Sequence, residues 1–311
     1  MPESFVYLDT DIGLGTPGAE IDDASALVLL MTSAGSHLLG AGSVFGNVPG
    51  ADALVNLCRL KSFFPRQDFK TGRGVDQPLV EGLEWFKDWQ AGYGATLPFD
   101  LPGSMPTSAR LMIDLVRQHP HQVTILAIGP MTNLALAARL EPDFIPLVKE
   151  VVAMGGSFGS DSEIPEFNMH CDPEAAHIVL NAGWDLTLFG LNITGQVKYT
   201  RQEFAALKGT HPVTLLLQQM APGWIDRVEE MGWEHGGCAL HDAVAAAYLV
   251  KPSLFQFKKT GIRVELHDIS KRGVIRFNDH DPSLPQVRVA TRVDVTGCHD
   301  LIWSYIQACE E

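Results

Sequence analysis

The chain has 311 residues, of which 46% are hydrophobic and 19% charged, and its formal net charge at pH 7 is −14. This composition is that of an ordinary globular enzyme, and the acidic balance excludes nucleic acid and anionic membranes as expected partners, because phosphate groups attract Lys and Arg. No apolar run approaches the roughly 18 residues that a membrane-spanning helix needs. The start of the chain also lacks the basic and apolar segments of a signal peptide.

The first predicted strand, at residues 5–8, leads into an acidic turn. Asp9 and Asp11 directly follow this strand, and Asp22 and Asp23 directly precede the apolar helix predicted over Ala24–Thr32. Acids crowded at the C-terminal end of a strand, where open α/β sheets bind ligands, repel one another unless a cation lies among them. Calcium or magnesium suits such oxygen ligands. The alternative is that Asp22 caps the helix and the other acids are solvated.

Strands and helices alternate along the rest of the chain. Further strands are predicted at residues 38–44, 123–128, 151–154, 186–189, 262–266, 274–277 and 287–295. Further helices are predicted at 51–63, 109–118, 132–139, from 173, in two pieces over 200–233, at 241–250 and at 301–309, with long loops at 64–106 and up to 171. This order predicts the α/β class, with one doubly wound, mostly parallel sheet flanked by helices and a small C-terminal antiparallel β appendage. We expect a single domain over residues 1–311.

The cysteines are few and scattered, and none forms a CxxC pair: Cys58, Cys171, Cys238, Cys298 and Cys309. An odd number of isolated thiols fits reduced cysteines better than disulfides or a zinc site. We therefore expect a cytoplasmic protein.

Polar groups follow most of the predicted strands and should converge on one rim of the sheet. These groups are Asp9, Asp11, Asn47, the Ile128 carbonyl, Gly155-Gly156 and Asn192. Two clusters further along the chain are expected to reach the same rim: Glu166-Phe167-Asn168 and His241-Asp242.

Together these motifs resemble the inosine-uridine-preferring nucleoside hydrolase family, whose opening signature is D-x-D-P-G-x-D-D followed by an apolar helix. The resemblance runs nearly end to end. Its matching segments are Asp9-Thr10-Asp11-Ile12-Gly13, Asp22-Asp23-Ala24, Phe45-Gly46-Asn47, residues 128–135, Met154-Gly155-Gly156, residues 166–168 with 172–176, and His241-Asp242-Ala243. Any one of these motifs is weak, but seven in the right order are specific.

The resemblance implies one calcium ion and a nucleoside substrate. Calcium would be bound by Asp11, by both carboxylate oxygens of Asp23, by the backbone oxygen of Ile128 and by Asp242. Two ribose hydroxyls and one water would complete a shell of the size that calcium takes. The family's members form dimers or tetramers, so the resemblance also implies a homodimer or homotetramer.

The implied reaction is calcium-dependent hydrolysis of the N-glycosidic bond of ribonucleosides to free nucleobase and ribose. Asp22 would take a proton from the attacking water, and His241 would give a proton to the leaving base. The substrate would be held by Asn47, Glu166 and Asn168 together with Asp22 and His241. For His241 the alternative is a histidine at a helix N-terminus bonded to a neighbour.

The chain departs from the family pattern in its first turn. Ten residues, Ile12 to Ile21, separate Asp11 from Asp22, where the family has three. This insertion is rich in glycine and small residues. We expect it to bulge outward and to let Asp22 and Asp23 regain their places at the helix start.

Two further departures concern the loops around the base and ribose. The stretch 84–94 lacks the histidine that many members carry, so Trp85 or Trp89 could stack on a nucleobase, although packing of the loop is the favoured role. A role for Trp224 or Trp233 in base contact is less favoured. The loop after Gly156 is short, and Asp161 or Ser162 lies nearest to the family's ribose-contacting asparagine.

Two other functions compete with this interpretation. A haloacid-dehalogenase-type phosphatase also begins with strand-D-x-D, but it needs Thr or Val two residues after the second Asp, where this chain has Gly13. A non-catalytic nucleoside- or ribose-binding protein would keep the ribose contacts without needing Asp22 beside a metal. Among the remaining polar residues, Asp172 is predicted to cap a helix and Asn192 to be structural.

Overall fold

The central feature of the structure, a computed structural model, is a nine-stranded sheet with strand order β10-β9-β11-β6-β5-β4-β1-β2-β3. The structure describes residues 4–80, 82, 84–158, 163–278, 281 and 283–309. The strands are β1 (Ser4–Thr10), β2 (Ser36–Ser43), β3 (Lys70–Gly72), β4 (Val123–Ala127), β5 (Glu150–Met154), β6 (Leu186–Phe189), β9 (Phe255–Val264), β10 (Ile275–Phe277) and β11 (Gln286–Val293). The α/β class predicted from the sequence is confirmed.

Six neighbouring strands of the sheet, in the order β3, β2, β1, β4, β5 and β6, are all parallel. Every residue of β4 and of β6 is buried, because helices cover both faces of the sheet. Strands buried on both faces are read from the sequence as continuous apolar runs, which explains why they could be predicted.

The C-terminal strands extend this same sheet rather than standing apart from it. β11 joins β6 in parallel, β9 pairs antiparallel with β11, and β10 pairs antiparallel with β9. A separate two-stranded ribbon is formed by β7 (Lys198–Tyr199) and β8 (Cys238–Ala239), which are antiparallel.

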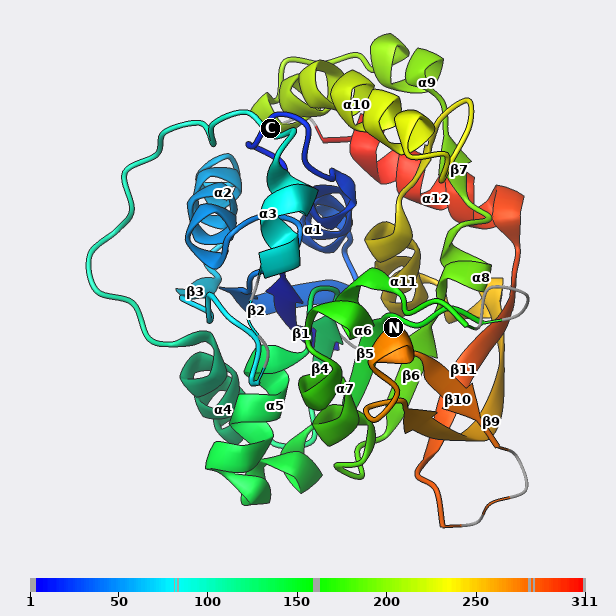
Figure 1. Ribbon diagram of the computed structural model, residues 1–311. Helices are drawn as coiled ribbons and strands as arrows, with labels where there is room; N and C mark the ends of the chain where they lie inside the picture. Colours follow the sequence, from blue (N-terminus) through cyan, green and yellow to red (C-terminus); the bar gives the residue numbers. More distant parts are fainter. Residues whose placement is uncertain are drawn as a thin grey trace.

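Helices form a layer on each side of the sheet (Figure 1). One layer holds α1 (Asp22–Thr32), α2 (Gly50–Ser62), α10 (Pro212–Glu230), α11 (His241–Val250) and α12 (Val295–Gln307), and the other holds α4 (Ser108–Gln118), α5 (Thr132–Leu140) and α7 (Pro173–Leu180). Shorter helices are α3 (Glu84–Gln90), α6 (Phe167–Cys171), α8 (Leu191–Thr194), α9 (Arg201–Ala206) and the 3₁₀ turns η1 (Pro142–Leu147), η2 (Pro252–Leu254) and η3 (Ile269–Lys271). None of the helices in the described ranges combines the length and apolar character needed to cross a bilayer.

Two loops contain more structure than the sequence predicts. The stretch 64–106 includes β3 and α3, and the loop that ends at Cys171 includes α6. In α3 only Phe86 is buried, and its ring meets that of Phe45 edge to face with centroids 5.6 Å apart. A helix of this length is marginal on its own and depends on such tertiary contacts, which a local pattern does not contain.

The insertion between Asp11 and Asp22 packs inward, so the expected outward bulge is wrong. Ile12 and Leu14 are fully buried, and Thr16 is nearly so. The side-chain amide of Asn56 on α2 donates to the carbonyl oxygens of Ile12 and Gly13 at 3.2 and 3.3 Å. Most of the insertion is therefore part of the core, with Pro17 exposed, and it is held against α2 by polar contacts with its backbone.

The parallel register brings the carboxyl ends of four strands level with one another. Asp9 in β1 lies opposite Ala127 in β4, Ala127 lies opposite Ala153 in β5, and Met154 lies opposite Phe189 in β6. The turns that follow these strands consequently meet at one rim, where ligands bind in open α/β sheets.

Candidate active site

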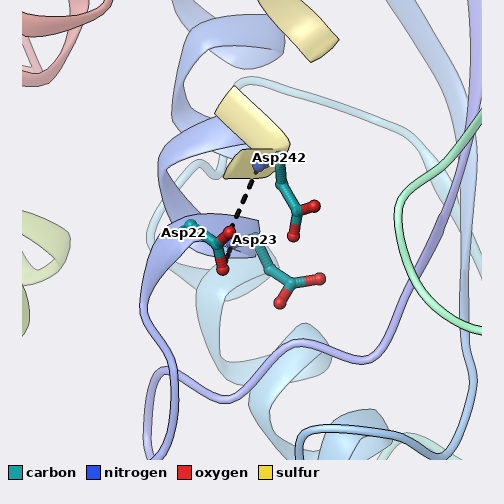
Figure 2. Close-up of side chains that lie close together, drawn as sticks. All are labelled: Asp22, Asp23 and Asp242. Carbon is teal, nitrogen blue, oxygen red and sulfur yellow. Dashed lines mark hydrogen bonds between the residues drawn. The ribbon is translucent and has the colours of Figure 1, made fainter. Parts of the chain in front are cut away.

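Two helices begin side by side at this rim. α1 starts with Asp22 and Asp23, and α11 starts with His241 and Asp242. The backbone N–H of Asp242 donates to Oδ2 of Asp22 at 3.2 Å, and the N–H of Asp23 donates to Oδ1 of Asp22 at 3.0 Å (Figure 2). Helix N-termini favour negative charge, so this junction is a suitable place for several carboxylates.

Three of these carboxylates form a cluster that can hold a metal ion. One oxygen each of Asp22, Asp23 and Asp242 lies within 4.8 Å of the other two, and all three side chains are buried. Figure 2 shows the three carboxylates around one common space. Carboxylate oxygens converging in this way are the donor set that hard divalent cations prefer.

Asp11 lies close enough to the cluster for the charges of Asp23 and Asp22 to act on its carboxylate. Its Oδ2 accepts the backbone N–H of Asn47 at 2.7 Å, whereas its Oδ1 is buried without a hydrogen-bond partner. A Cβ on Gly46 would lie 2.0 Å from Oδ2, so the backbone can approach Asp11 only because residue 46 is glycine. The orphaned oxygen is a second observation that fits a cation at this place.

Burial and mutual repulsion disfavour the charged forms of these acids. The pKa of Asp23 is raised to about 8 by burial and by the neighbouring Asp22, against hydrogen bonds from Thr10 and Asn47. Burial, followed by the charges of nearby aspartates, also raises the pKa values of Asp11 and Asp242 well above their ordinary range. A divalent cation would offset this repulsion, so the residues present fit one.

Asn168 bridges the ends of two strands. Its side-chain amide donates to the carbonyl oxygens of Ile128 and Met154 at 2.8 and 3.3 Å. With its NH₂ group committed to these carbonyls, its amide oxygen is the polar atom left for a ligand. The Ile128 carbonyl keeps a second lone pair beside the acidic cluster.

Glu166 and Asn47 are also held by specific contacts. Glu166 accepts hydrogen bonds from the backbone N–H groups of Asn168, Gly156 and Met169 at 2.9–3.2 Å and thereby caps α6. Burial raises its pKa, and these N–H groups oppose that shift. Asn47 donates its amide to Asp23 at 3.0 Å, and its Oδ1 is buried without a hydrogen-bond partner. Both side chains are thus fixed with acceptor oxygens at the rim.

Asp9 has a different environment from the other acids of the first turn. Its Oδ1 accepts hydrogen bonds from Asn133 at 2.9 Å and Ser108 at 3.1 Å, and burial raises its pKa to about 7. These contacts connect β1 to α4 and α5, on the other side of the sheet from α1.

A cavity of about 610 Å³ adjoins the cluster, and Asp22 and Asp242 are among the residues that line it. Among its lining residues are the predicted site residues Asp22, Asn47, Ile128, Glu166, Asn168, His241 and Asp242. Asn192, predicted to be structural, also lines the cavity, and its Oδ1 is buried without a partner. Asp161 and Ser162 fall outside the described residues.

Five aromatic side chains also line the cavity: Trp89, Phe158, Phe167, Trp224 and Trp233. Trp89 stacks on Trp233 with centroids 5.3 Å apart and lies against Phe167 at 4.7 Å. Trp85 is not among the lining residues and packs instead on Phe86 and His170. Trp89, Trp224 and Trp233 are therefore better placed for a ligand than their sequence context indicates.

Some lining residues were not predicted from the sequence. Phe167 lies in the motif Glu166-Phe167-Asn168, and its aromatic ring was the feature that could have indicated a ligand contact. Glu20 belongs to the insertion, lines the cavity, and has a pKa raised well above its usual range by burial and then by Asp22. Lys198 and Glu234, which also line the cavity, lie in no motif that the sequence analysis used.

Comparisons with known proteins agree with this geometry. The sequence profile of the inosine-uridine preferring nucleoside hydrolase family matches residues 6–300. The chain is 33% identical to uridine nucleosidase 1 of Arabidopsis thaliana, covering 97% of this chain and 92% of that protein. It is 31% identical to the inosine-uridine preferring nucleoside hydrolase of Crithidia fasciculata, covering 94% of each.

Solved structures give the same result at the level of the fold. A plant nucleoside hydrolase superimposes with a TM-score of 0.85 at 28% identity, over 99% of this chain and 100% of that one. A purine-preferring ribonucleoside hydrolase from Gardnerella vaginalis has the same fold, with a TM-score of 0.82 at 23% identity over 97% and 98%.

The family match and the similar structures, together with an acidic cluster at the rim of a doubly wound sheet, identify a hydrolase of the nucleoside hydrolase class. The chain belongs to the inosine-uridine preferring nucleoside hydrolase family.

Proposed function

We propose that this protein hydrolyses the N-glycosidic bond of ribonucleosides and releases nucleobase and ribose in a calcium-dependent reaction. The observation that carries the proposal is the buried cluster of Asp22, Asp23 and Asp242, two members of which, Asp22 and Asp242, line a cavity that also has aromatic lining residues. Support also comes from relatives named as uridine nucleosidase and pyrimidine-specific ribonucleoside hydrolase.

We assign the cation to Asp11, Asp23, Asp242 and the carbonyl oxygen of Ile128. A bound divalent cation supplies positive charge that holds ribose hydroxyls and lowers the pKa of water. Asp22 belongs to the same cluster, but both of its oxygens accept backbone N–H groups. Because these contacts fix its orientation, we assign it the role of general base.

In the chemical step, a water oxygen bonds to the anomeric carbon of ribose while Asp22 accepts a proton from that water. The glycosidic C–N bond breaks, and its electron pair goes to the nucleobase as the sugar gains oxocarbenium character. His241 gives a proton to the leaving base. Its position at the cavity wall, bonded to neighbours yet only partly buried, serves that role.

Ribose is held by the fixed oxygens at the rim. Asn47, Glu166 and Asn168 each present acceptor oxygens, and ribose hydroxyls are donors that match them. Orienting several hydroxyls at once restricts the sugar to a reactive geometry and lowers the entropic part of the barrier. The aromatic wall receives the nucleobase by stacking.

A panel of purine and pyrimidine nucleosides with a reducing-sugar readout, with and without a chelator, tests the proposal. The parent protein should release ribose, the chelator should abolish release, and added calcium should restore it. Asp22→Asn should lower kcat by about 100-fold or more, because general base catalysis contributes on that order. An Asp22→Asn protein that contains calcium and keeps near-parental kcat would refute the base assignment. A parent protein that binds nucleosides without releasing ribose would instead be a binding protein.

A further inference from the structure

The imidazole of His241 is held from two sides. Its Nδ1 lies 2.8 Å from Oγ1 of Thr194, and its Nε2 lies 3.7 Å from Oε1 of Glu234. The Thr194 hydroxyl also lies 3.3 Å from the carbonyl oxygen of Gly190; when it donates there, its oxygen is left to accept a hydrogen from Nδ1. Nε2 is therefore the nitrogen that faces Glu234 at the cavity wall.

Glu234 is itself fixed by the protein. Its Oε2 accepts the backbone N–H of Ala239 at 2.9 Å and lies 3.4 Å from Nζ of Lys198. The Glu234 side chain is 12% exposed, so its contacts are only weakly screened by solvent. With two donors on Oε2, Oε1 is the oxygen that remains for His241. A carboxylate offers only acceptors, and it therefore orients Nε2 as a donor.

The small β7–β8 ribbon brings these groups together. Thr194 ends α8 shortly before β7, and Lys198 in β7 pairs directly with Ala239 in β8. His241 then begins α11 two residues after β8. The ribbon thus fixes both partners of the histidine relative to the helix that carries it.

We propose that Glu234 is a positioning residue for leaving-group activation, holding the Nε2–H of His241 where the departing nucleobase can take that proton. The inference rests on the proposed nucleoside hydrolysis. When the C–N bond breaks, its electron pair stays on the nucleobase and the Nε2 proton of His241 moves to the base. Glu234 acts only through the histidine, and its contacts with Ala239 and Lys198 keep it in place.

This role predicts a dependence on the leaving group. A nucleobase is a poor leaving group and needs a proton, whereas p-nitrophenolate departs as a stable anion without one. Loss of the Glu234 contact should therefore slow the hydrolysis of nucleosides and leave the hydrolysis of p-nitrophenyl ribofuranoside nearly unchanged. A defect in folding, in ribose binding or in water activation would slow both kinds of substrate.

The experiment compares Glu234→Gln and Glu234→Asp with the parent protein on both kinds of substrate. Glu234→Gln keeps the shape and an acceptor for Ala239 but loses the charge, whereas Glu234→Asp keeps the charge but withdraws it by one methylene. For both variants, kcat on nucleosides should fall about 10- to 100-fold at nearly unchanged KM. Their kcat on p-nitrophenyl ribofuranoside should stay within about threefold of the parental value. Glu229→Gln is the matched control, because Glu229 accepts the N–H of exposed Gly236 in the same segment, and it should behave as the parent.

Three outcomes would overturn the inference while leaving the proposed function intact. These are an equal loss on both kinds of substrate, a change confined to KM, and parental kcat on nucleosides in both Glu234 variants. A parent protein that releases ribose from no nucleoside would overturn the proposed function itself, and the role of Glu234 with it. The parent arm of the experiment therefore separates the two failures.

Discussion

Asp172 shows how much one buried carboxylate can hold together. It accepts hydrogen bonds from Ala175 N–H at 2.9 Å, as the cap of α7, from the Thr132 hydroxyl at 2.7 Å, and from Leu79 N–H at 2.9 Å. Asp172→Ala leaves all three donors without this acceptor. We expect the free energy of unfolding, measured by urea titration, to fall by about 2–4 kcal/mol.

A surface acid is the matched control for this change. Asp114 pairs with Arg110 on α4 with both side chains largely exposed, so Asp114→Ala should cost less than about 1 kcal/mol. Equal losses for the two variants would contradict the role assigned to Asp172.

At the residue scale, the sequence predicts best where a residue type fits its local position. Asp172 before Pro173 is readable as a helix cap because both residues act within one turn. Glu234 is not readable in this way, because it is fixed by the N–H of Ala239 and by Lys198, and Lys198 is brought near only by the pairing of β7 with β8. The motifs thus indicate the residues of the acidic cluster and His241, but not the residues that hold those side chains in place.

The element that distinguishes this chain is the insertion of residues 12–21. The Asn56 amide contacts two of its carbonyl oxygens and Oγ1 of Thr16 at 3.1–3.3 Å, and its Oδ1 accepts from Arg59 at 2.9 Å. Because Asn56 is fully buried, Asn56→Ala should lower the free energy of unfolding by about 1–3 kcal/mol.

Since the insertion leads directly into Asp22, Asn56→Ala should also raise the calcium concentration that gives half-maximal activity. Calcium titrations of activity and urea titrations would check the two effects. Asp52→Ala on the same helix is the control, with an expected loss of no more than about 1 kcal/mol. An Asn56→Ala protein as stable as the parent would show that the insertion is not held by α2.

Elements with strong local patterns were predicted closely, and those that depend on distant contacts were not. The prediction for α11 agrees with the structure, and the two helical pieces predicted over 200–233 are α9 and α10. β3 and α3 were missed because they are short and depend on neighbours in the sheet and on Phe45. The expected outward bulge of the insertion failed for the same reason, since glycine content does not show that α2 provides donors for its backbone.

At the scale of the whole molecule, one rim of the sheet collects acids that would repel one another without a cation. Alternating strands and helices predicted this arrangement, because the carboxyl ends of parallel strands lie at the same edge of the sheet. The sequence did not predict that β11 would continue the sheet in parallel with β6, a pairing between segments almost a hundred residues apart.

The concentration of acids predicts how stability depends on pH and calcium. In the cation-free protein, the folded-state pKa values of Asp9 and Asp23 are raised to about 7 and about 8, above the ordinary value of 3.8. At pH values between the ordinary pKa and these raised pKa values, the folded state then binds more protons than the unfolded chain. The resulting stabilisation is fully present below the ordinary pKa and is lost as pH rises through about 7–8.

The chelated protein should therefore melt at a lower temperature near about pH 8.5 than near about pH 6. In the proposed site calcium would replace the protons that hold the acids together, so saturating calcium should raise Tm most at the higher pH, on the order of 5–10 °C. Calorimetry of chelated and calcium-loaded protein at both pH values checks this result. A chelated protein that becomes more stable as pH rises over this interval would contradict the repulsion inferred for the cluster, and a Tm that calcium leaves unchanged at both pH values would show that the cation does not stabilise the fold.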